Sequence, residues 1–237
     1  MNAITVKHVS FSYDDLLILD DISFQITPGE IIAIIGPNGS GKTTLIKQIL
    51  GLLSPDKGSI TLFDKAPKKQ RTKIGYVPQR FEFDRTTPIT IYEFLKLEQC
   101  GNKHHAISKI DTFLELVGLN THKHARLSSL SGGQFQRAMI ARALLHEKKI
   151  LIFDEPSTGI DIAGEKTIYD LIEKINKERD VTCIIVSHEL NIVTKYAHRV
   201  ICINKKLVCM GIPEQVITQD TLSSLYGKHT GLYHSHT

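Results

Sequence analysis

The sequence predicts an α/β fold, in which helices surround a mostly parallel sheet, and three observations support this prediction. Apolar and polar residues alternate as in strands near the N-terminus, in residues 4–26 and 59–63. Apolar runs alternate with helical patterns between residues 134 and 186, and such strand-helix-strand series form parallel sheets. Residues 80–130 form a mostly helical stretch between these regions. A chain of 237 residues with 41% hydrophobic residues can bury such a core without disulfide bonds.

The N-terminal part is expected to contain an antiparallel sheet. Residues 4–11 and 22–26 read as two strands, with the turn-prone residues 13–15 between them. A further turn at residues 54–58 precedes a third strand at residues 59–63. Because two strands come before the first helix and one follows it, we expect an antiparallel sheet beside the parallel core.

The same patterns predict the elements further along the chain. A strand and its exit at residues 74–79 lead into the helical stretch. In chain order we then expect helices at residues 92–97, 107–117 and 134–145, a strand at 150–153, a helix at 166–175 and a strand at 182–186.

A glycine-rich segment between a strand and a helix predicts a phosphate-binding loop. An apolar strand precedes it, a helix at residues 45–50 follows it, and its spacing is G-x-x-x-x-G-K-[ST]. Glycines let backbone N–H groups converge on phosphate oxygens, and the helix N-terminus adds partial positive charge. Lys42 can reach the β- and γ-phosphates, and the Thr43 hydroxyl can ligate Mg²⁺. The sequence therefore predicts binding of a nucleoside triphosphate through Gly36, Pro37, Asn38, Gly39, Ser40, Gly41, Lys42, Thr43 and Thr44.

Two carboxylates follow the apolar strand at residues 150–153. In a parallel sheet the carboxyl end of a strand opens onto the ligand site, so Asp154 is placed to hold Mg²⁺. Glu155 beside it can orient and polarise an attacking water molecule. An acidic pair at a strand end is common on protein surfaces, but downstream of a phosphate loop it indicates hydrolysis.

The net charge, the length of the apolar runs and the cysteine spacing indicate in which compartment the protein works and which partners it binds. The net charge of +4 is too small to indicate nucleic-acid binding. No apolar run approaches the roughly 20 residues that span a bilayer, and the N-terminus lacks the pattern of a signal peptide. We therefore expect a cytosolic protein unless a partner holds it at a membrane. The four cysteines show no C-x-x-C spacing and are expected to be reduced, mostly buried thiols: Cys100, Cys183, Cys202 and Cys209.

The run Leu130-Ser131-Gly132-Gly133-Gln134 resembles the LSGGQ signature of the nucleotide-binding subunits of ABC transporters. The resemblance covers almost the whole chain, and Ser131 also reads as a helix N-cap. It implies a P-loop NTPase with a RecA-like parallel sheet core, an antiparallel β subdomain and an inserted helical subdomain. The implied boundaries are about 1–79 and 150–220 for the core and β subdomain, 80–149 for the helical subdomain and 221–237 for a tail.

The resemblance also implies roles for single residues. Tyr13 matches the residue that stacks on adenine, with an exposed turn tyrosine as the alternative. Gln79 matches the glutamine that contacts Mg²⁺ and water, and His188 matches the histidine at the γ-phosphate. Asp161 matches a loop at the dimer interface, although the preceding residues differ from the commoner S-A-L-D. The resemblance implies four catalytic residues: Glu155, His188, Gln79 and Lys42. It implies further contacts to ATP from Ser131, Gly132, Gly133, Gln134 and Asp161. The implied ligands of Mg²⁺ are Thr43, Gln79 and Asp154.

The signature implies a homodimer, because in the family the signature of one subunit completes the ATP site of the other. Integral membrane permease subunits are implied as partners, docked through the segment after Gln79, with no nucleic acid involved. The chain would then lie in the cytoplasm at the inner face of the cell membrane. ATP would close the dimer, and hydrolysis, with water positioned by Glu155 and His188, would reset it.

Finer features resemble the zinc and manganese uptake ATPases of bacteria. These features are Val77 to Arg80, Phe83-Asp84, Pro88 to Ile91 and Glu155 to Asp161. They favour zinc import, with a periplasmic or surface metal-binding protein as an indirect partner. The open alternatives are a manganese or iron importer, and an ABC ATPase with an assembly or cell-wall regulatory role.

Seven further histidines are expected to have no part in the site. Three of them lie in the C-terminal tail, which we expect to be disordered rather than a zinc sensor: His229, His234 and His236. Four others are expected to be exposed residues of the helical subdomain: His104, His105, His122 and His124.

Overall fold

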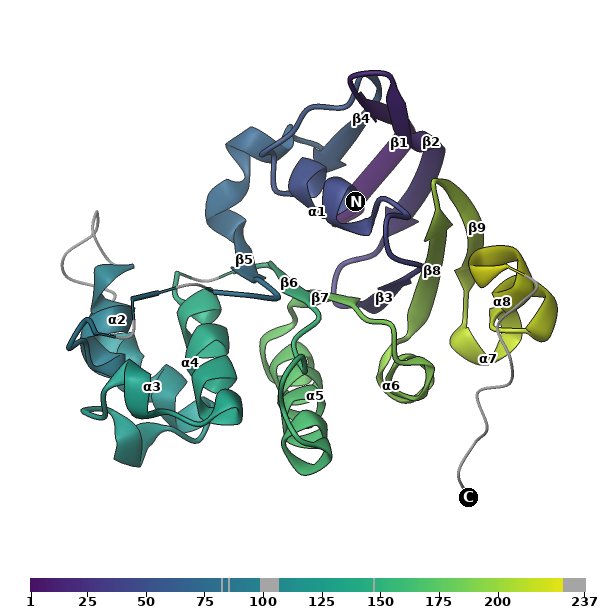
Figure 1. The fold of residues 1–237 in the computed structure, drawn as a ribbon. Helices are drawn as coiled ribbons and strands as arrows, with labels where there is room; N and C mark the ends of the chain where they lie inside the picture. Colours follow the sequence, from purple (N-terminus) through teal and green to yellow (C-terminus); the bar gives the residue numbers. More distant parts are fainter. Residues whose placement is uncertain (82, 85, 99–106, 147, 228–237) are drawn as a thin grey trace. The chain divides into compact units, whose positions relative to one another are not determined.

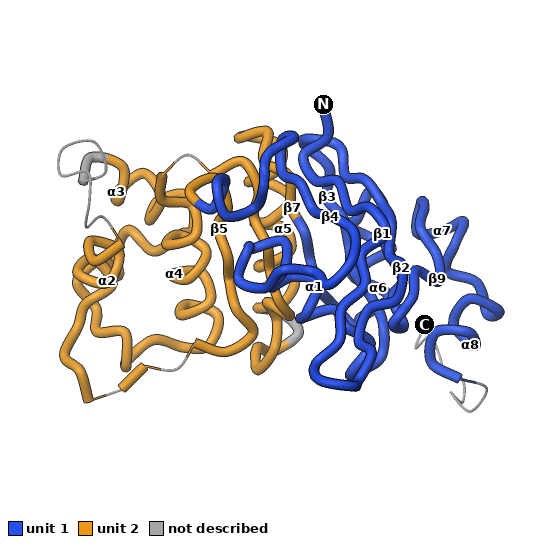
Figure 2. The backbone as a smooth tube through the Cα atoms, turned by 90° about the horizontal axis from the view of Figure 1, so that it is seen from above, with its two compact units in different colours: residues 1–71, 184–237 blue, residues 72–183 orange. Residues whose placement is uncertain are grey.

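The computed structural model describes residues 1–81, 83–84, 86–98, 107–146 and 148–227. The chain forms two compact units, shown in blue and orange in Figure 2. The first unit contains residues 1–71 and 184–237, and the second contains residues 72–183. The described helices include none that is long and apolar enough to cross a membrane.

The first unit contains the expected antiparallel sheet. Its strands are β1 (Ile4–Tyr13), β2 (Leu16–Ile26) and β4 (Lys57–Leu62), in the order β2-β1-β4 (Figure 1). Both pairs are antiparallel, which confirms the prediction. The first two strands run further into the hairpin than predicted, because Tyr13 still pairs with Leu16.

The first unit also contains β3 (Ile31–Ile35), which is completely buried and leads through the glycine-rich loop into α1 (Lys42–Ile49). β3 pairs in parallel with β8 (Arg199–Asn204), and β8 pairs antiparallel with β9 (Lys206–Gly211). Three short helices complete the unit: α6 (Leu190–Tyr196), α7 (Pro213–Val216) and α8 (Gln219–Tyr226). The sequence patterns did not predict β8, β9 or these helices.

Two of the four cysteines form a disulfide bond in the first unit. Cys202 in β8 and Cys209 in β9 are directly paired in the strand register, with their Cα atoms 4.9 Å apart. The expectation that both are reduced thiols is therefore wrong, because the strand pairing that joins them leaves no mark in their sequence spacing. Cys183 is free and buried, as expected, whereas Cys100 lies outside the described residues.

The second unit contains the parallel strand pair β5–β6 and four of the α-helices that the structure describes. β5 (Ile74–Val77) pairs in parallel with β6 (Ile150–Asp154). Around them are α2 (Ile91–Leu97), α3 (Ile107–Leu116), α4 (Gly132–Leu144) and α5 (Ile162–Arg179). α4 contacts α2, α3, α5 and β5. Gly75 permits the close approach of α4, since a Cβ atom there would lie 2.2 Å from the Ala143 carbonyl oxygen.

Tight turns and caps set the ends of these elements. Short 3-10 turns are η1 (Pro67–Lys69), η2 (Arg71–Lys73), η3 (Asn120–His122) and η4 (Leu127–Ser129). α5 begins four residues before its predicted start, because the Asp161 carboxylate caps it by accepting a hydrogen bond from Gly164 N at 2.9 Å. The last of the predicted strands, β7 (Thr182–Val186), has the predicted bounds.

Candidate active site

The loop between β3 and α1 has the form of a phosphate cradle. A Cβ atom at Gly36 would lie 2.0 Å from the Ile203 carbonyl oxygen, and one at Gly41 would lie 2.5 Å from Leu19 Cδ2. At Gly39, in contrast, φ is +77° and no heavy atom lies within 4 Å of the Cβ position. The loop is therefore packed tightly at two glycines and open at the third, where a phosphate can approach the backbone.

Lys42 and the start of α1 give this loop its positive charge. The Lys42 side chain is only 8% exposed. Its ammonium group donates hydrogen bonds to the carbonyl oxygens of Gly36 at 2.7 Å and Pro37 at 2.9 Å. The N-cap residue Gly41 has no side chain to cap α1, and the N-terminus of this helix adds its partial positive charge to the loop. Together these groups suit a polyphosphate.

Two further predicted residues lie in the first unit. Tyr13 is 44% exposed at the end of β1, and its ring packs edge-on against Phe11 with a centroid distance of 4.9 Å. His188 is exposed two residues after the end of β7. Its neighbour Ser187 donates a backbone hydrogen bond to the Ile34 carbonyl at 3.3 Å, which brings this strand end beside the strand that enters the phosphate loop.

The second unit holds the predicted Mg²⁺ ligand Asp154 at the end of β6. Asp154 is buried and accepts a hydrogen bond from the Tyr76 hydroxyl at 3.2 Å. Burial, together with the negative charge of Asp154, raises the pKa of Tyr76, so the hydroxyl stays a donor. The carboxylate of Asp154 is a hard oxygen donor of the kind that Mg²⁺ prefers, and the exposed Thr43 hydroxyl of the first unit is another, so each residue fits this ion by its chemistry.

The sequence patterns did not single out Tyr76. Tyr76 in β5 lies opposite Ile152 in β6, and Ile152 is two residues before Asp154. Because side chains two residues apart in a strand point to the same face, Tyr76 and Asp154 share one face of the strand pair. Knowledge of the strand register would have identified it.

Glu155 and Gln79 are in direct contact. The Gln79 side-chain amide donates a hydrogen bond to the Glu155 carboxylate, and Thr158 Oγ1 donates another at 3.4 Å. Glu155 has a φ of +48°, a left-handed conformation that is uncommon for a residue with a side chain and is concentrated at functional sites. Two predicted catalytic residues are thus brought together, although they are 76 positions apart in the chain.

The predicted signature segment begins α4. Ser131 Oγ accepts a hydrogen bond from Gln134 N at 3.3 Å, and Gln134 Oε1 accepts one from Ser131 N at 3.0 Å, which makes a capping box. A Cβ atom at Gly132 would lie 3.3 Å from the Gly159 carbonyl oxygen. The signature therefore packs against the loop that ends at Asp161. Ser131 is the N-cap of α4, as predicted.

His122 contacts the signature segment, which the sequence did not indicate. It is half-buried instead of exposed as expected, and its Nε2 atom lies 3.2 Å from Gln134 Nε2. No sequence spacing marks this contact, because it depends on how η3 turns toward α4.

The predicted site residues thus fall into two groups, one in each unit. The phosphate loop, Tyr13 and His188 belong to the first unit; Gln79, Asp154, Glu155, Asp161 and the signature belong to the second. No group of three or more His, Cys, Asp or Glu side chains suited to a metal occurs among the described residues. The tail residues His229, His234 and His236, like His104 and His105, lie outside the described residues.

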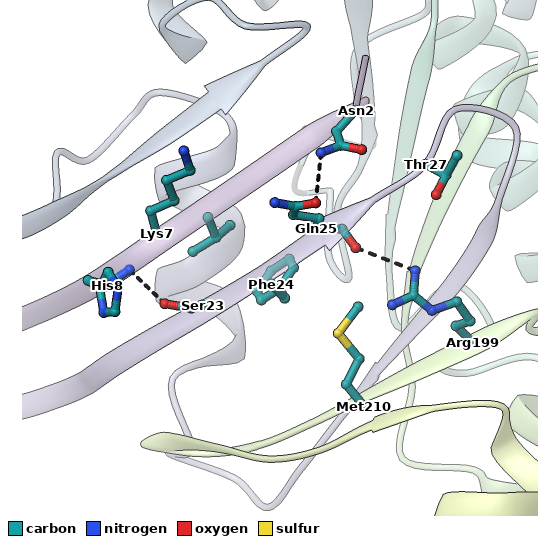
Figure 3. Close-up of a pocket in the computed structure, with 10 residues that line it drawn as sticks. Asn2, Lys7, His8, Ser23, Phe24, Gln25, Thr27, Arg199 and Met210 are labelled. Atoms are coloured by element: carbon teal, nitrogen blue, oxygen red, sulfur yellow. Dashed lines mark hydrogen bonds between the residues drawn. The ribbon is translucent and has the colours of Figure 1, made fainter.

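A separate groove in the first unit, with a cavity volume of about 570 Å³, contains none of the predicted site residues (Figure 3). Its polar groups largely bond to one another. Asn2 donates to Gln25 Oε1 at 2.9 Å, and Arg199 donates to the Gln25 carbonyl at 3.5 Å. We assign no ligand to it.

Known proteins resemble this chain in sequence. The family profile described as ABC transporter matches residues 19–158. A protein of Buchnera aphidicola subsp. Schizaphis graminum (strain Sg), named zinc import ATP-binding protein ZnuC, is 40% identical over 230 residues, which are 97% of this chain and 92% of that protein. A protein of the same name from Pseudomonas syringae pv. syringae (strain B728a) is 37% identical over 222 residues, 92% of this chain and 81% of that protein.

Solved structures resemble it as well. The structure of cbiO1 from Clostridium perfringens, described as part of the ABC transporter complex cbiONQ, is 30% identical. It matches with a TM-score of 0.84 over 94% of this chain and 93% of that one. MJ1267, described as an ATP-binding cassette of an ABC transporter, is 24% identical and has a TM-score of 0.85 over 95% of this chain and 98% of that one, a likeness that concerns the fold alone.

Proposed function

Because this chain belongs to the ABC transporter family of ATP-binding proteins, with the P-loop NTPase fold and ATPase activity of that family, we propose that it powers zinc import. The observation that carries the choice of zinc is the 40% identity, over 97% of this chain, to a relative named for zinc import. The motif-level resemblance of residues 77–91 to zinc and manganese uptake ATPases supports the same choice.

The phosphate loop binds the triphosphate of ATP in this proposal. Lys42 exchanges its two carbonyl acceptors for phosphate oxygens, and the loop N–H groups contact the remaining oxygens. The partly exposed ring of Tyr13 stacks on adenine. Thr43, Asp154 and Gln79 would hold Mg²⁺, which would supply positive charge to neutralise the triphosphate.

Glu155 acts as the base in hydrolysis. Its carboxylate takes a proton from a water molecule, the water oxygen forms a bond to the γ-phosphorus, and the bond from that phosphorus to the β–γ bridging oxygen breaks. Phosphate and ADP are the products. Gln79 orients the carboxylate through its hydrogen bond, and His188 contacts the γ-phosphate.

The signature segment places the second half of each site on another subunit. We propose a homodimer in which Ser131, Gly132, Gly133, Gln134 and Asp161 of one chain contact the ATP held by the phosphate loop of the other. The dimer couples to integral membrane permease subunits at the inner face of the membrane. A periplasmic or surface metal-binding protein delivers the zinc.

Zinc-limited growth tests this proposal. Deletion of the gene should impair growth only when zinc is chelated, and either added zinc or a wild-type copy should restore it. A Lys42→Ala copy should fail to restore growth, because removal of one charge-assisted contact to phosphate lowers ATP affinity about 10- to 100-fold. Lys47→Ala, an exposed lysine of the same helix, is the matched control and should restore growth. Rescue by manganese but not zinc would refute zinc import while leaving the ATPase intact.

A further inference from the structure

His122 forms a hydrogen bond to the glutamine of the signature segment. Its Nε2 atom lies 3.2 Å from Gln134 Nε2, and its Nδ1 atom lies 3.0 Å from Thr121 Oγ1. All these groups belong to the second unit. An amide nitrogen only donates, so Nε2 of His122 must accept, and the ring proton must sit on Nδ1.

The orientation of the Gln134 amide is set from its other end. Gln134 Oε1 accepts the Ser131 N–H at 3.0 Å as part of the capping box, which leaves Nε2 directed at His122. A continuous chain of donors and acceptors thus runs from Thr121 through His122 and Gln134 to Ser131, the first residue of the predicted contact to ATP.

We propose that His122 is a positioning residue for the signature segment, and that its protonation releases this segment. The neutral imidazole fixes the Gln134 amide, and through it Ser131 and the first turn of α4. The inference rests on the proposed function, because it assumes that this turn meets the ATP of the partner subunit.

Protonation creates a conflict between donors. Both ring nitrogens of a cationic imidazole carry hydrogen, so an N–H group of His122 would face the NH₂ group of Gln134. A flip of the amide would relieve the conflict but would take the acceptor oxygen away from Ser131 N. Either the His122 contact or the capping box must therefore break.

The charged groups around this turn come from its own residues and from α2, α3 and α4, and on α2 Glu93 interacts electrostatically with His124. Lys123 and His124 follow His122 in the chain, and Arg137 of α4 donates hydrogen bonds to the Val117 and Gly133 carbonyls at 3.4 Å. The acidic residues of α3 are Asp111, which is paired with Lys123 at 2.6 Å, and the exposed Glu115. Among described residues, no carboxylate forms an ion pair with His122.

Two substitutions separate the proposal from a merely structural role. His122→Gln keeps a hydrogen-bond acceptor that does not titrate, so its ATPase rate should lack the acid-side loss that we expect of the wild type. That loss should be about two- to tenfold, the size expected for one side-chain hydrogen bond. His122→Phe has no acceptor and should show the low rate even at about pH 8. His124→Gln, an exposed neighbour, is the control and should keep the wild-type profile.

Two further measurements on the full chain test the tautomer of His122 and the effect of pH on dimerisation. Long-range proton–nitrogen NMR spectra should show His122 protonated on Nδ1 at about pH 8, with its signals identified by their loss in His122→Gln. ATP-driven dimerisation in the Glu155→Gln background should weaken on acidification, and less so when His122→Gln is added.

Superimposable wild-type and His122→Gln pH profiles, or a proton found on Nε2, would overturn the inference. Absence of ATP-driven dimerisation in every variant would instead overturn the proposed dimeric site.

Discussion

Gln79 donates a hydrogen bond from its side-chain amide to the carboxylate of Glu155. Gln79 lies two residues after β5 and Glu155 directly follows β6, and these strands are parallel and in register, with Val77 opposite Phe153. Parallel strands bring their carboxyl ends to one edge of a sheet. The register of the two strands thus positions Gln79 and Glu155. We expect a substitution at either residue to change the orientation of the other side chain.

The first prediction concerns hydrolysis. Glu155→Gln keeps the size of the side chain and removes the base, so the ATPase rate should fall about 10²- to 10⁴-fold. Binding of ATP should persist, and the protein should accumulate as an ATP-bound dimer in size-exclusion chromatography. Glu115→Gln, at an exposed position of α3, is the matched control and should behave as wild type. An ATPase rate within a few-fold of wild type would rule out Glu155 as the base.

The second prediction concerns the signature segment. Ser131→Arg should leave nucleotide binding to the phosphate loop unchanged but block the ATP-driven dimer, because the larger side chain fills the space intended for the partner's γ-phosphate. Light scattering with and without ATP measures this dimer.

Ser131→Asp provides the control for the helix cap. Aspartate is as good an N-cap as serine, so α4 should keep its start, while the added negative charge repels the phosphate. Both variants should therefore remain monomeric with ATP. Dimerisation of Ser131→Asp at wild-type ATP concentrations would show that the segment meets no phosphate.

The third prediction concerns a buried polar side chain in α1. Gln48 is 1% exposed, and neither its amide oxygen nor its nitrogen has a hydrogen-bond partner within the part of the chain that the structure describes. Gln48→Met has a similar shape without the buried polar atoms, so the free energy of unfolding should rise by about 1–3 kcal/mol. Urea unfolding measures the change, and Gln215→Met at an exposed position should give no gain. A lower free energy of unfolding in Gln48→Met would contradict the claim that the buried Gln48 amide lacks hydrogen-bond partners.

The fourth prediction concerns alkaline stability. Burial raises the pKa of the Cys183 thiol. In the unfolded chain a thiol loses its proton near its ordinary value of about 8.5, while the native thiol keeps it. The native state then binds more protons, so the contribution of Cys183 to stability is complete below about pH 8.5 and is lost as the pH rises above it, by up to about 1.4 kcal/mol per pH unit.

Cys183→Ala removes this titration. Its free energy of unfolding should therefore fall less steeply than that of the wild type between about pH 8 and 10, whatever the constant cost of the smaller side chain. Urea unfolding under reducing conditions at several pH values gives the two slopes. Equal slopes would mean that the thiol titrates alike in both states.

The sequence by itself determined the local features of this protein. The strand, glycine-rich loop and helix around Lys42, the apolar strand that ends at Asp154, and the cap at Ser131 each depend on residues close together in the chain. Short windows carry this information because turn chemistry, capping and amphipathic periodicity are local properties. The antiparallel sheet could be predicted for the same reason.

Tertiary structure alone decided which distant groups meet. It placed the Ile203 carbonyl against Gly36, joined Cys202 to Cys209, paired Tyr76 with Asp154 and brought His122 to Gln134. Each of these contacts depends on strand register or on how a turn packs against a helix. A shift of one residue in register would turn the side chains to the opposite face, and no short stretch of sequence specifies that choice.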